Sequence, residues 1–425
     1  MANIAVLGAG IGGLSQAYEL KQTLGSGHRI VLINDSDRFE FTPSNPWVAV
    51  GWRNAGQITV ELPALMARHG IEFIGQAATG VRPADNAIDL ADGSVLEYDY
   101  LVIATGPKLA FDEVPGLGPE GYTSSICKTG HATSASVDFE ALAREPGPVV
   151  IGAAQGASCF GPAYEYAFIV DTELRKRKIR DQVPMYFVTP EPYIGHLGLD
   201  GVGDTKGLME SELRQRHIRW ITNAKIREIT AGKISITEVD DNAADKKQHD
   251  LSFKHAMILP AFKGIDAVFG IEGLVNPRGF ILADKFQRNP AFPNVYAVGV
   301  CVAIPPVAPT PLPVGTPKTG YMIESMVTAV THNIRDAIAG NEPTRRATWN
   351  ALCLADFGDS GVVFIALPQI PPRNTNWAAR GKWVHLAKIG FEKYFLRKIR
   401  NGQTEPYYEK AVLSLMGVDK LKADT

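Results

Sequence analysis

The sequence predicts an α/β protein with two nucleotide-binding-type domains and a C-terminal amphipathic module. An apolar strand at residues 3–7 leads directly into the turn GAGIGG and a helix, and a similar strand, turn and helix start at residue 149. Such a unit opens a Rossmann-like dinucleotide-binding domain, so its two occurrences predict two domains of the type that binds FAD or NAD(P). Between residues 380 and 400, basic and aromatic residues follow helical spacing, which indicates an amphipathic helix outside both domains.

Length and composition describe an ordinary folded protein. The chain has 425 residues, enough for two or three domains of about 100–200 residues each. Its hydrophobic content of 45% and charged content of 21% are typical of folded domains, and its net charge of −2 argues against a nucleic-acid partner. No run of about 18 apolar residues would span a bilayer, and the N-terminus lacks the basic region of a secretory signal. We therefore expect a protein that is soluble or lies on a membrane surface.

The first glycine turn has the spacing of a dinucleotide-binding site. Gly8, Gly10 and Gly13 occupy the G-x-G-x-x-G positions. The first glycine permits the tight turn, the second lets the backbone approach a pyrophosphate, and the third lets helix and strand pack closely. The helix N-terminus then offers unpaired N–H groups to the phosphates. The ribose partner normally follows about 20 residues later, where Asn34 and Asp35 end the next strand, and either could serve.

Two later segments belong with this turn. One strand ends at Ala104, Thr105 and Gly106, and a late strand ends at Gly299. Together with the glycine turn they resemble the two-dinucleotide-fold flavoproteins, in which both segments flank FAD. The residue after Gly299 is Val300, whereas those flavoproteins usually carry an aspartate that contacts the ribityl chain. We therefore expect FAD to be held differently at this point.

The second glycine turn departs from the dinucleotide pattern. Ala154 replaces the glycine that would let a pyrophosphate approach, and Cys159 lies at the start of the following helix. The simplest interpretation is a domain kept for its architecture after losing nicotinamide binding, which makes another electron partner necessary. A thiolate at a helix N-terminus has a lowered pKa and is a good nucleophile, so we expect Cys159 to be reactive.

A proline-rich segment leads into another helix. Six prolines fall within residues 305–317, and because proline fixes φ the segment is expected to be rigid and extended. The helix N-terminus behind it carries partial positive charge, which would stabilise a reduced flavin. We expect Lys318 and Thr319, which head this helix, to contact the flavin ring.

The C-terminal segment is basic and aromatic. Residues 380–400 contain seven Lys or Arg and one acid. Apolar and aromatic residues form one stripe there, and a second stripe follows after residue 407: Trp383, Leu386, Ala387, Gly390, Phe391, Tyr394 and Phe395, then Tyr408, Ala411, Val412, Leu415 and Met416. This pattern fits a helix in the membrane interface. It equally fits a helix packed on the core with a solvated charged face, and periodicity leaves both open.

Essentially the whole chain resembles the membrane-associated sulfide:quinone oxidoreductases. The segments that carry the resemblance are PSNPWVAVGW, ATGPKLAF, GASCFGPAYEYA, EPYIGHLG, TPKTGYMIESM, FIALPQ and WVHLAKIGFEKYF. The resemblance implies FAD as cofactor, oxidation of hydrogen sulfide to polysulfur, and delivery of electrons to a membrane quinone. It also favours the interface for the C-terminal helix, because the quinone dissolves in lipid.

The cysteines of the family pattern fall on Cys127, Cys159 and Cys353. By this resemblance, Cys159 and Cys353 lie on either side of the flavin pocket and are joined by sulfur. Sulfide would attack that bridge by thiol–disulfide exchange and leave one cysteine as a persulfide. Cys127 is expected to relay sulfur or assist product release. Cys301 matches no family cysteine and follows a core strand, so we expect a small buried hydrophobe there. The chain has no CxxC pair, which argues against a structural zinc site, and we expect no metal.

Further site residues complete the hypothesis. Candidate proton carriers are His131, His196 and Glu165, because sulfide chemistry needs a base. Aromatic faces suit a quinone ring, and the resemblance places Phe391 and Tyr408 beside it, with Gly320 and Tyr321 towards the flavin. The remaining residues expected to contact FAD are Ala9, Gly12, Ser44 and Ala78.

These expectations define the predicted domains and the alternatives. We expect a discontinuous FAD-binding domain at residues 1–120 and 280–340, a second Rossmann-like domain at 121–279, and a quinone- and membrane-binding module at 341–425. Such a protein would be monotopic on the cell membrane and could form homo-oligomers. The alternatives are a type II NADH:quinone oxidoreductase, the soluble flavoprotein subunit of a sulfide dehydrogenase, and a non-catalytic membrane sensor that binds flavin or sulfur.

Overall fold

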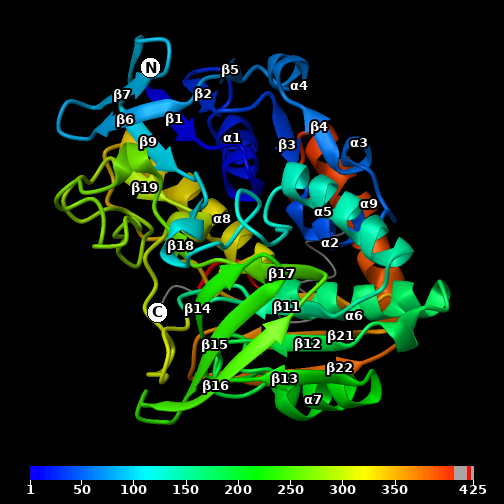
Figure 1. Cartoon of the computed structure of the whole chain (residues 1–425). Coiled ribbons are helices and arrows are strands. Elements are labelled where there is room, and N and C mark those ends of the chain that lie inside the picture. The colour runs from blue at the N-terminus through cyan, green and yellow to red at the C-terminus, as the bar shows by residue number, and fades with distance from the viewer. Residues whose placement is uncertain (406–418, 423–425) are drawn as a thin grey trace.

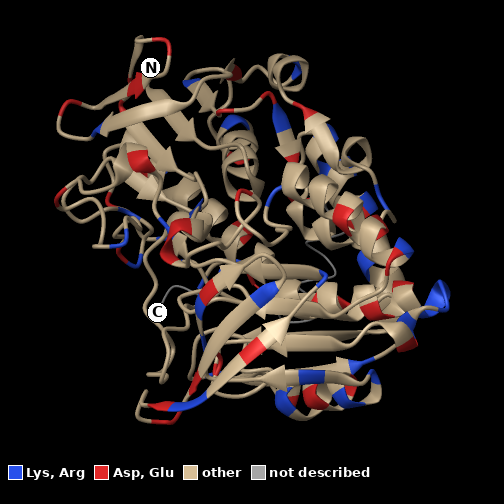
Figure 2. Cartoon of the chain, viewed as in Figure 1, with Lys and Arg blue, Asp and Glu red and all other residues tan. Residues whose placement is uncertain are grey.

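The computed structural model describes residues 1–405 and 419–422, which form two lobes (Figure 1). The upper lobe in this view contains the N-terminal strands, and the lower lobe contains strands β11 to β16. Acidic and basic segments are interspersed over both lobes, as Figure 2 shows, in keeping with the small net charge of the chain.

The upper lobe is built on a parallel sheet of five strands. Its order is β19 (Val295–Ala297), β9 (Tyr100–Ile103), β1 (Asn3–Leu7), β2 (Arg29–Ile33) and β5 (Glu72–Ile74). The apolar runs predicted as strands are almost fully buried, because helices cover a parallel sheet on its faces. The sheet joins β19, from late in the chain, to strands from the first hundred residues.

Helices α1 (Ile11–Leu24) and α8 (Gly320–Ile338) pack against each other beside this sheet. A buried hydrogen bond from Gln16 Nε2 to Thr331 Oγ1, 2.7 Å long, links them. The smaller elements of this part of the chain are β3 (Arg38–Glu40), β4 (Thr59–Glu61), β6 (Ala78–Arg82), β7 (Ala87–Leu90), β8 (Val95–Glu97), α2 (Asn45–Val48), α3 (Ala55–Ile58) and α4 (Pro63–Arg68).

The lower lobe contains a second parallel sheet, in the order β13 (Ile218–Ile221), β12 (Met185–Val188), β11 (Val149–Ala153) and β17 (His255–Leu259). An antiparallel sheet lies beside it, and a short strand pair and three helices complete this region: β14 (Ala224–Thr230), β15 (Lys233–Val239), β16 (Asp245–Ser252), β10 (Lys108–Leu109), β18 (Phe262–Lys263), α5 (Thr129–Arg144), α6 (Gly161–Lys176) and α7 (Thr205–Gln215). The predicted second strand–turn–helix unit is thus present as β11 and α6. The exact domain boundaries stay a prediction.

The C-terminal region forms an antiparallel sheet and a long helix. Strands β20 (Ala351–Asp356), β21 (Gly361–Leu367) and β22 (Thr375–Arg380) pair in that order, and α9 (Trp383–Arg400) packs on β20 and β21. The basic segment therefore starts as the end of a strand, and its helix begins only at Trp383. Val384, Phe395 and Ile399 of α9 face the core.

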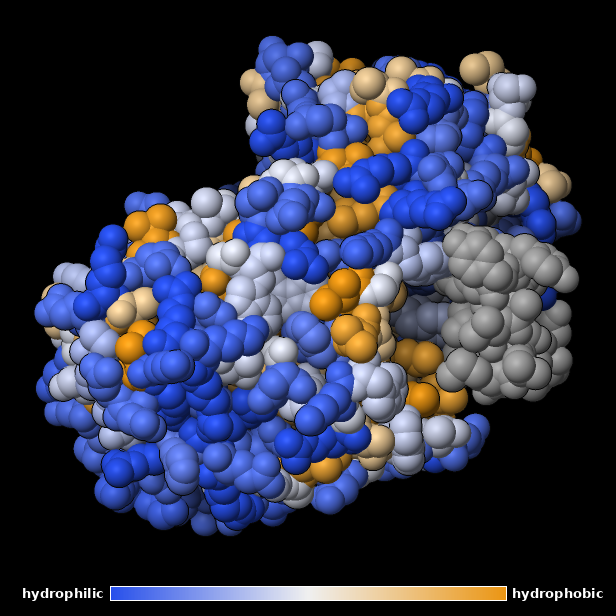
Figure 3. Space-filling model, turned by 90° about the vertical axis from the view of Figure 1, so that its right-hand side faces the viewer, coloured by the Kyte–Doolittle hydropathy of each residue, from blue (hydrophilic) through white to orange (hydrophobic). Residues whose placement is uncertain are grey.

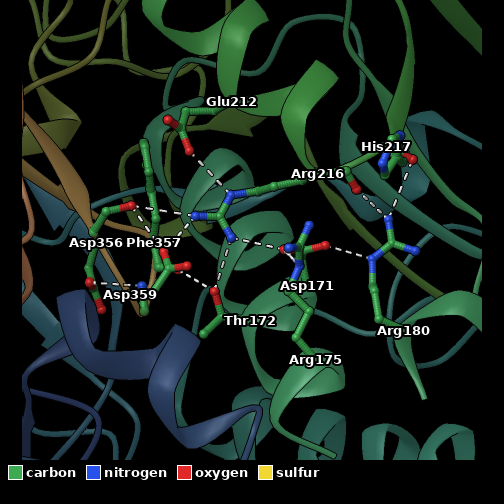
Figure 4. A network of polar contacts seen from close by, with 12 residues as sticks. Asp171, Thr172, Arg175, Arg180, Glu212, Arg216, His217, Asp356, Phe357 and Asp359 are labelled. Carbon is green, nitrogen blue, oxygen red and sulfur yellow. Dashed lines mark hydrogen bonds and ion pairs between the residues drawn. The ribbon is translucent and has the colours of Figure 1, made fainter. Parts of the chain in front are cut away.

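A buried charge network fastens the turn between β20 and β21 to α6 (Figure 4). The Arg216 guanidinium donates to Asp171 at 2.9 Å and to Asp359 at 2.6 Å, and the Thr172 hydroxyl donates to the Phe357 carbonyl at 2.7 Å. Asp171 is fully buried and also pairs with Arg180 at 2.6 Å. Strand β20 carries Cys353, so this network fixes the strand that holds a candidate catalytic cysteine.

Candidate active site

The first glycine turn has the shape of a dinucleotide cradle. Gly8 has φ +103°, and a Cβ there would lie 2.6 Å from the carbonyl oxygen of Ala104. A Cβ on Gly13 would lie 1.8 Å from the Gly8 oxygen, whereas a Cβ on Gly10 would meet nothing within 4 Å. Glycine is thus required at the first and third positions for packing. The backbone at the middle position faces open space, as a pyrophosphate site needs.

Asn34, one of the two predicted ribose contacts, forms hydrogen bonds within the protein instead. Its Oδ1 accepts the Ala9 N–H at 2.9 Å, and its Nδ2 donates to the Ser36 carbonyl at 2.8 Å. The amide oxygen therefore holds the glycine turn in place, and the amide nitrogen holds the loop that follows β2. Asp35 is exposed next to it and remains the better-placed candidate for the ribose.

The head of α8 completes a site that fits FAD. Thr319 is the N-cap of this helix, and its hydroxyl is buried without a hydrogen-bond partner in the described part of the chain. A Cβ on Gly12 would touch Val298, just before Gly299, and Ile323 of α8, so the glycine turn, the end of β19 and α8 converge. A hydroxyl without a partner and the N–H groups at a helix N-terminus can donate hydrogen bonds to the electron-rich edge of a flavin ring.

The other predicted FAD contacts vary in what the structure shows. Ala104, Thr105 and Gly106 follow β9 directly beside the Gly8 turn. Ala78 is half-buried at the start of β6. Ser44 is fully buried, and its hydroxyl donates to the carboxylate of Glu392 on α9 at 2.5 Å, so it anchors that helix.

Three of the four cysteines gather at one place. Cys159 lies in the loop before α6, Cys353 on β20, and Cys127 in the loop before α5. They lie near enough to interact: besides burial, which is the larger cause, repulsion from Cys127 raises the pKa of Cys159, and repulsion from Cys159 raises the pKa of Cys353. Cys301 is buried elsewhere, and its thiol donates to the Ile103 and Val298 carbonyls, each at 3.2 Å, as expected for a structural cysteine.

The expected low pKa of Cys159 is wrong. Helix α6 begins at Gly161 with Phe160 as N-cap, so Cys159 precedes the cap. Burial of the sulfur raises the pKa of Cys159 to about 12 and that of Cys127 to about 11, and also raises the pKa of Cys353. Desolvation of a thiolate outweighs a helix dipole that acts from beyond the first turn. A free thiol here therefore needs a base before it can react.

Glu165 is placed to be that base. It lies on the first turns of α6, is 6% exposed, and interacts electrostatically with both Cys159 and Cys353. Its carboxylate accepts the Asp356 N–H at 2.6 Å and forms a buried ion pair with Lys388 of α9. Burial raises the pKa of Glu165, which brings a carboxylate closer to the range useful for proton transfer at neutral pH.

The two candidate histidines have separate surroundings. His131 Nδ1 lies 3.2 Å from the Ser125 hydroxyl, which also accepts the Cys127 N–H at 3.2 Å, so His131 is coupled to Cys127. His196 is buried in a loop, where it accepts the Gly198 N–H at 3.2 Å. Burial lowers the pKa of both histidines. The Gly198 contact stabilises the loop around His196, and the role of either histidine as a proton carrier stays a prediction.

Of the residues predicted to bind quinone, Gly320 and Tyr321 lie at the N-terminus of α8 and Phe391 lies on α9. Phe391 is 41% exposed and packs at ring-centroid distances of 6.0 Å on Phe41 and 5.8 Å on Phe395. Gly320 is exposed and Tyr321 half-buried at the first turn of α8. Tyr408 lies outside the described residues. Lys318 is largely enclosed, and burial lowers its pKa to about 8 while nearby Cys301 and Cys159 oppose this.

The second nucleotide turn is filled by the chain itself. Glu191 follows β12, where a ribose-binding acid would lie, but it is fully buried. Its carboxylate accepts hydrogen bonds from Tyr164 at 2.9 Å, Thr189 at 2.7 Å and the Leu197 N–H at 2.6 Å. Buried Glu191 and Ala154 therefore do not offer the usual ribose and pyrophosphate contacts, and the loss of nicotinamide binding stays a prediction.

Sequence reasoning missed Lys388, Asp356 and Trp47. Lys388 is one of seven basic residues in its segment, and no local pattern separates it from the solvated ones. Its partner Glu165 lies 223 residues earlier in the chain. The one available signal was its place inside the family-like segment WVHLAKIGFEKYF.

Comparisons with known proteins agree with this site. The model of the family described as pyridine nucleotide-disulphide oxidoreductase matches residues 2–331. The sulfide-quinone reductase of Aquifex aeolicus is 42% identical over 415 residues, covering 97% of this chain and 94% of that protein. The crystal structure of the Aquifex aeolicus sulfide:quinone oxidoreductase superposes with a TM-score of 0.95 at 41% identity, covering 100% of this chain and 98% of that one. A structure of NDH2 from Plasmodium falciparum, at 15% identity and a TM-score of 0.72, shares the fold alone. The chain therefore belongs to the pyridine nucleotide-disulphide oxidoreductase family and, within it, to the FAD-dependent sulfide-quinone reductases.

Proposed function

We propose that this protein oxidises sulfide at Cys159 and Cys353 and passes the electrons through FAD to a membrane quinone. The observation that carries the proposal is the pair of interacting cysteines with Glu165 beside them, next to a glycine turn and helix end that fit FAD. The sulfide-quinone reductase of Aquifex aeolicus, with 42% identity over nearly the whole chain, supports the same substrate and acceptor.

The chemistry assigned to the cysteines balances as follows. HS⁻ attacks a sulfur that bridges Cys159 and Cys353, which leaves one as a persulfide and the other as a thiolate. When the bridge re-forms with one more sulfur atom, two electrons and one proton leave the sulfur site. FAD, when bound, supplies the two-electron acceptor between sulfur and quinone. Because Glu165 is the carboxylate beside both cysteines, it receives the proton that H₂S loses when it becomes HS⁻.

Helix α9 supports the membrane part of the proposal. Its charged Lys388, Glu392 and Lys398 face the interior, whereas Trp383 is 53% and Leu386 69% exposed. The exposed face also carries Lys382, Lys393 and Arg397, and this combination of apolar and basic side chains suits a membrane interface. Figure 3 shows hydrophobic side chains interrupting a hydrophilic surface on the side where α9 lies. No helix among the described residues is long and apolar enough to cross a membrane.

An NADH:quinone oxidoreductase is the weaker candidate, because Glu191 and Ala154 leave the usual nicotinamide nucleotide contacts unavailable. A sensor without turnover would use the same cysteines but would not cycle with quinone.

The test is an anaerobic absorbance titration of the FAD-loaded protein with sulfide, followed by a short-chain quinone. We expect sulfide to bleach the flavin and quinone to restore it, with NADH having no effect. Cys159→Ser should abolish bleaching by sulfide but leave FAD bound. Cys301→Ser is the matched control, because a serine hydroxyl can donate to the same two carbonyls, and it should bleach normally. Bleaching by NADH and not by sulfide would refute the proposal.

A further inference from the structure

Glu165 is the inner end of a line of buried polar groups. The Asp356 N–H donates to its carboxylate, and the two carboxyl groups lie near enough for Asp356 to act electrostatically on Glu165. The Asp356 carboxylate is itself fully buried, and its Oδ1 lies 2.8 Å from Nδ1 of His385 on α9. Lys388, one helical turn after His385, bridges back to Glu165.

The outer end of the line reaches a surface pocket. The His385 side chain is 26% exposed and lines a pocket of about 200 Å³ together with Trp47, Trp52, Arg53, Lys176 and Ile389. Both tryptophan rings meet the imidazole edge-on at a centroid distance of 6.3 Å, which holds the ring between Asp356 and the pocket. A group that can carry a proton therefore connects a fully buried carboxylate with the surface.

A structural role alone explains this arrangement poorly. Asp356 already accepts hydrogen bonds from Trp47 Nε1 at 2.7 Å and from the Gly358 N–H at 3.0 Å, so both of its oxygens are satisfied without the imidazole. A buried carboxylate that only stabilised the turn would need no titratable partner open to solvent. Histidine is the side chain whose protonation changes near neutral pH.

Charged side chains from three parts of the chain surround His385. Lys388 lies three residues after His385 on α9. On α6, the Lys176 ammonium lies 4.0 Å from the centroid of the Trp52 ring, and Glu173 accepts the Trp52 indole N–H at 2.8 Å. From the segment after α2, His385 faces Arg53, which lies 4.7 Å from the Trp47 ring and pairs with Glu392. His385 thus lies between the buried Asp356 carboxylate and the Lys176 and Arg53 cations that line the pocket.

We propose that Asp356 and His385 form the outlet through which the sulfur site releases its proton to solvent. The inference rests on the proposed function, in which each H₂S that is oxidised to bridging sulfur yields two electrons and two protons. FAD, when bound, would take up the two electrons together with one proton on the way to the quinone. The other proton, which H₂S loses to Glu165 when it becomes HS⁻, passes with Lys388 beside it to the Asp356–His385 pair and enters water at the pocket. His385 acts through Glu165 and does not touch the cysteines.

The test measures the first-order rate at which sulfide bleaches the flavin of the FAD-loaded protein by anaerobic stopped flow across pH 6–9. We expect His385→Ala to lower this rate about 100-fold, the lower end of the range for a proton-transfer group. Added imidazole should restore much of the rate, because the pocket next to the vacated site has room for it. His385→Gln keeps a polar group beside Asp356 but cannot carry a proton, so it should be equally slow.

Ile389→Ala is the matched control, because it enlarges the same pocket from the same helix without removing a titratable group. It should keep the wild-type rate and pH profile and should not respond to imidazole. Wild-type rates and pH profiles in both His385 variants would overturn the outlet, as would a loss that imidazole cannot restore. If sulfide fails to bleach the wild-type flavin, the proposed function itself is wrong. If it bleaches the wild type and both His385 variants equally fast, only the outlet is wrong.

Discussion

Replacing Asp171 by asparagine tests the charge network that fastens β20 to α6 (Figure 4). Asp171 is fully buried and binds Arg180 at 2.6 Å and Arg216 at 2.9 Å, and both guanidinium groups are also largely buried. A third partner, Arg175, is 47% exposed, and its pair with Asp171 contributes little. Asparagine keeps the volume but removes the charge and so leaves two buried cations short of a partner. Breaking a buried pair in this way costs about 3–5 kcal/mol.

Urea denaturation followed by tryptophan fluorescence measures this cost. With a slope of about 3 kcal/mol per molar urea, Asp171→Asn should lower the unfolding midpoint by about 1–1.7 M. The matched control is Asp250→Asn, which removes the same charge from an exposed 2.8 Å pair with Lys233 and should leave the unfolding midpoint almost unchanged. Equal midpoints for the two variants would refute the reasoning that burial makes the Asp171 network important.

Three further predictions concern the site and the acid response. Glu165→Gln should slow flavin bleaching by sulfide about 10²- to 10⁴-fold, measured by stopped flow, while FAD content stays unchanged. Gly8→Ala should purify without FAD, measured by its absorbance, because the added Cβ would lie 2.6 Å from the Ala104 oxygen at φ +103°. Burial lowers the pKa of His255 from 6.5 to about 4, so the unfolded chain takes up that proton first as the pH falls. Stability should therefore fall by roughly 3 kcal/mol between about pH 6.5 and 4, and His255→Gln should remove this part of the acid loss in urea midpoints. Wild-type bleaching by Glu165→Gln would contradict the first prediction, and bound FAD in Gly8→Ala would contradict the second. Acid sensitivity that His255→Gln leaves unchanged would contradict the third.

The glycine turn and the head of α8 were predictable because their signals are local. Gly8, Gly10 and Gly13 stand in one short stretch, and the backbone geometry that they require follows from that stretch alone. The loss of the second turn was equally visible, since a single alanine at position 154 removes the close approach. The resemblance to the sulfide:quinone oxidoreductases added the pairing of Cys159 with Cys353, which no spacing indicates.

The protonation chemistry could not be predicted, because burial decides it. Sequence position suggested a low pKa for Cys159 near a helix end, but the sulfur is enclosed and its pKa rises to about 12. Asn34 looked like a ribose partner by distance from the turn, yet its amide holds the turn itself. Which of the three candidate bases lies beside Cys159 likewise depended on the fold, which brings Glu165 there.

The sequence by itself determined the order of strands, turns and helices, the FAD-type glycine turn, the loss of the second turn and the amphipathic character of the C-terminal segment. Those features depend on neighbours within a few residues, where periodicity and backbone conformation act directly. Only the tertiary structure decided which face of α9 is buried: Lys388, Glu392 and Lys398 turn inward, and Trp383 and Leu386 turn outward. The reason is that the partners which make a buried charge stable, Glu165 for Lys388 and Arg53 for Glu392, come from segments more than two hundred residues away. The same long-range assembly places His385 beside Asp356, and with it the proposed route for the proton.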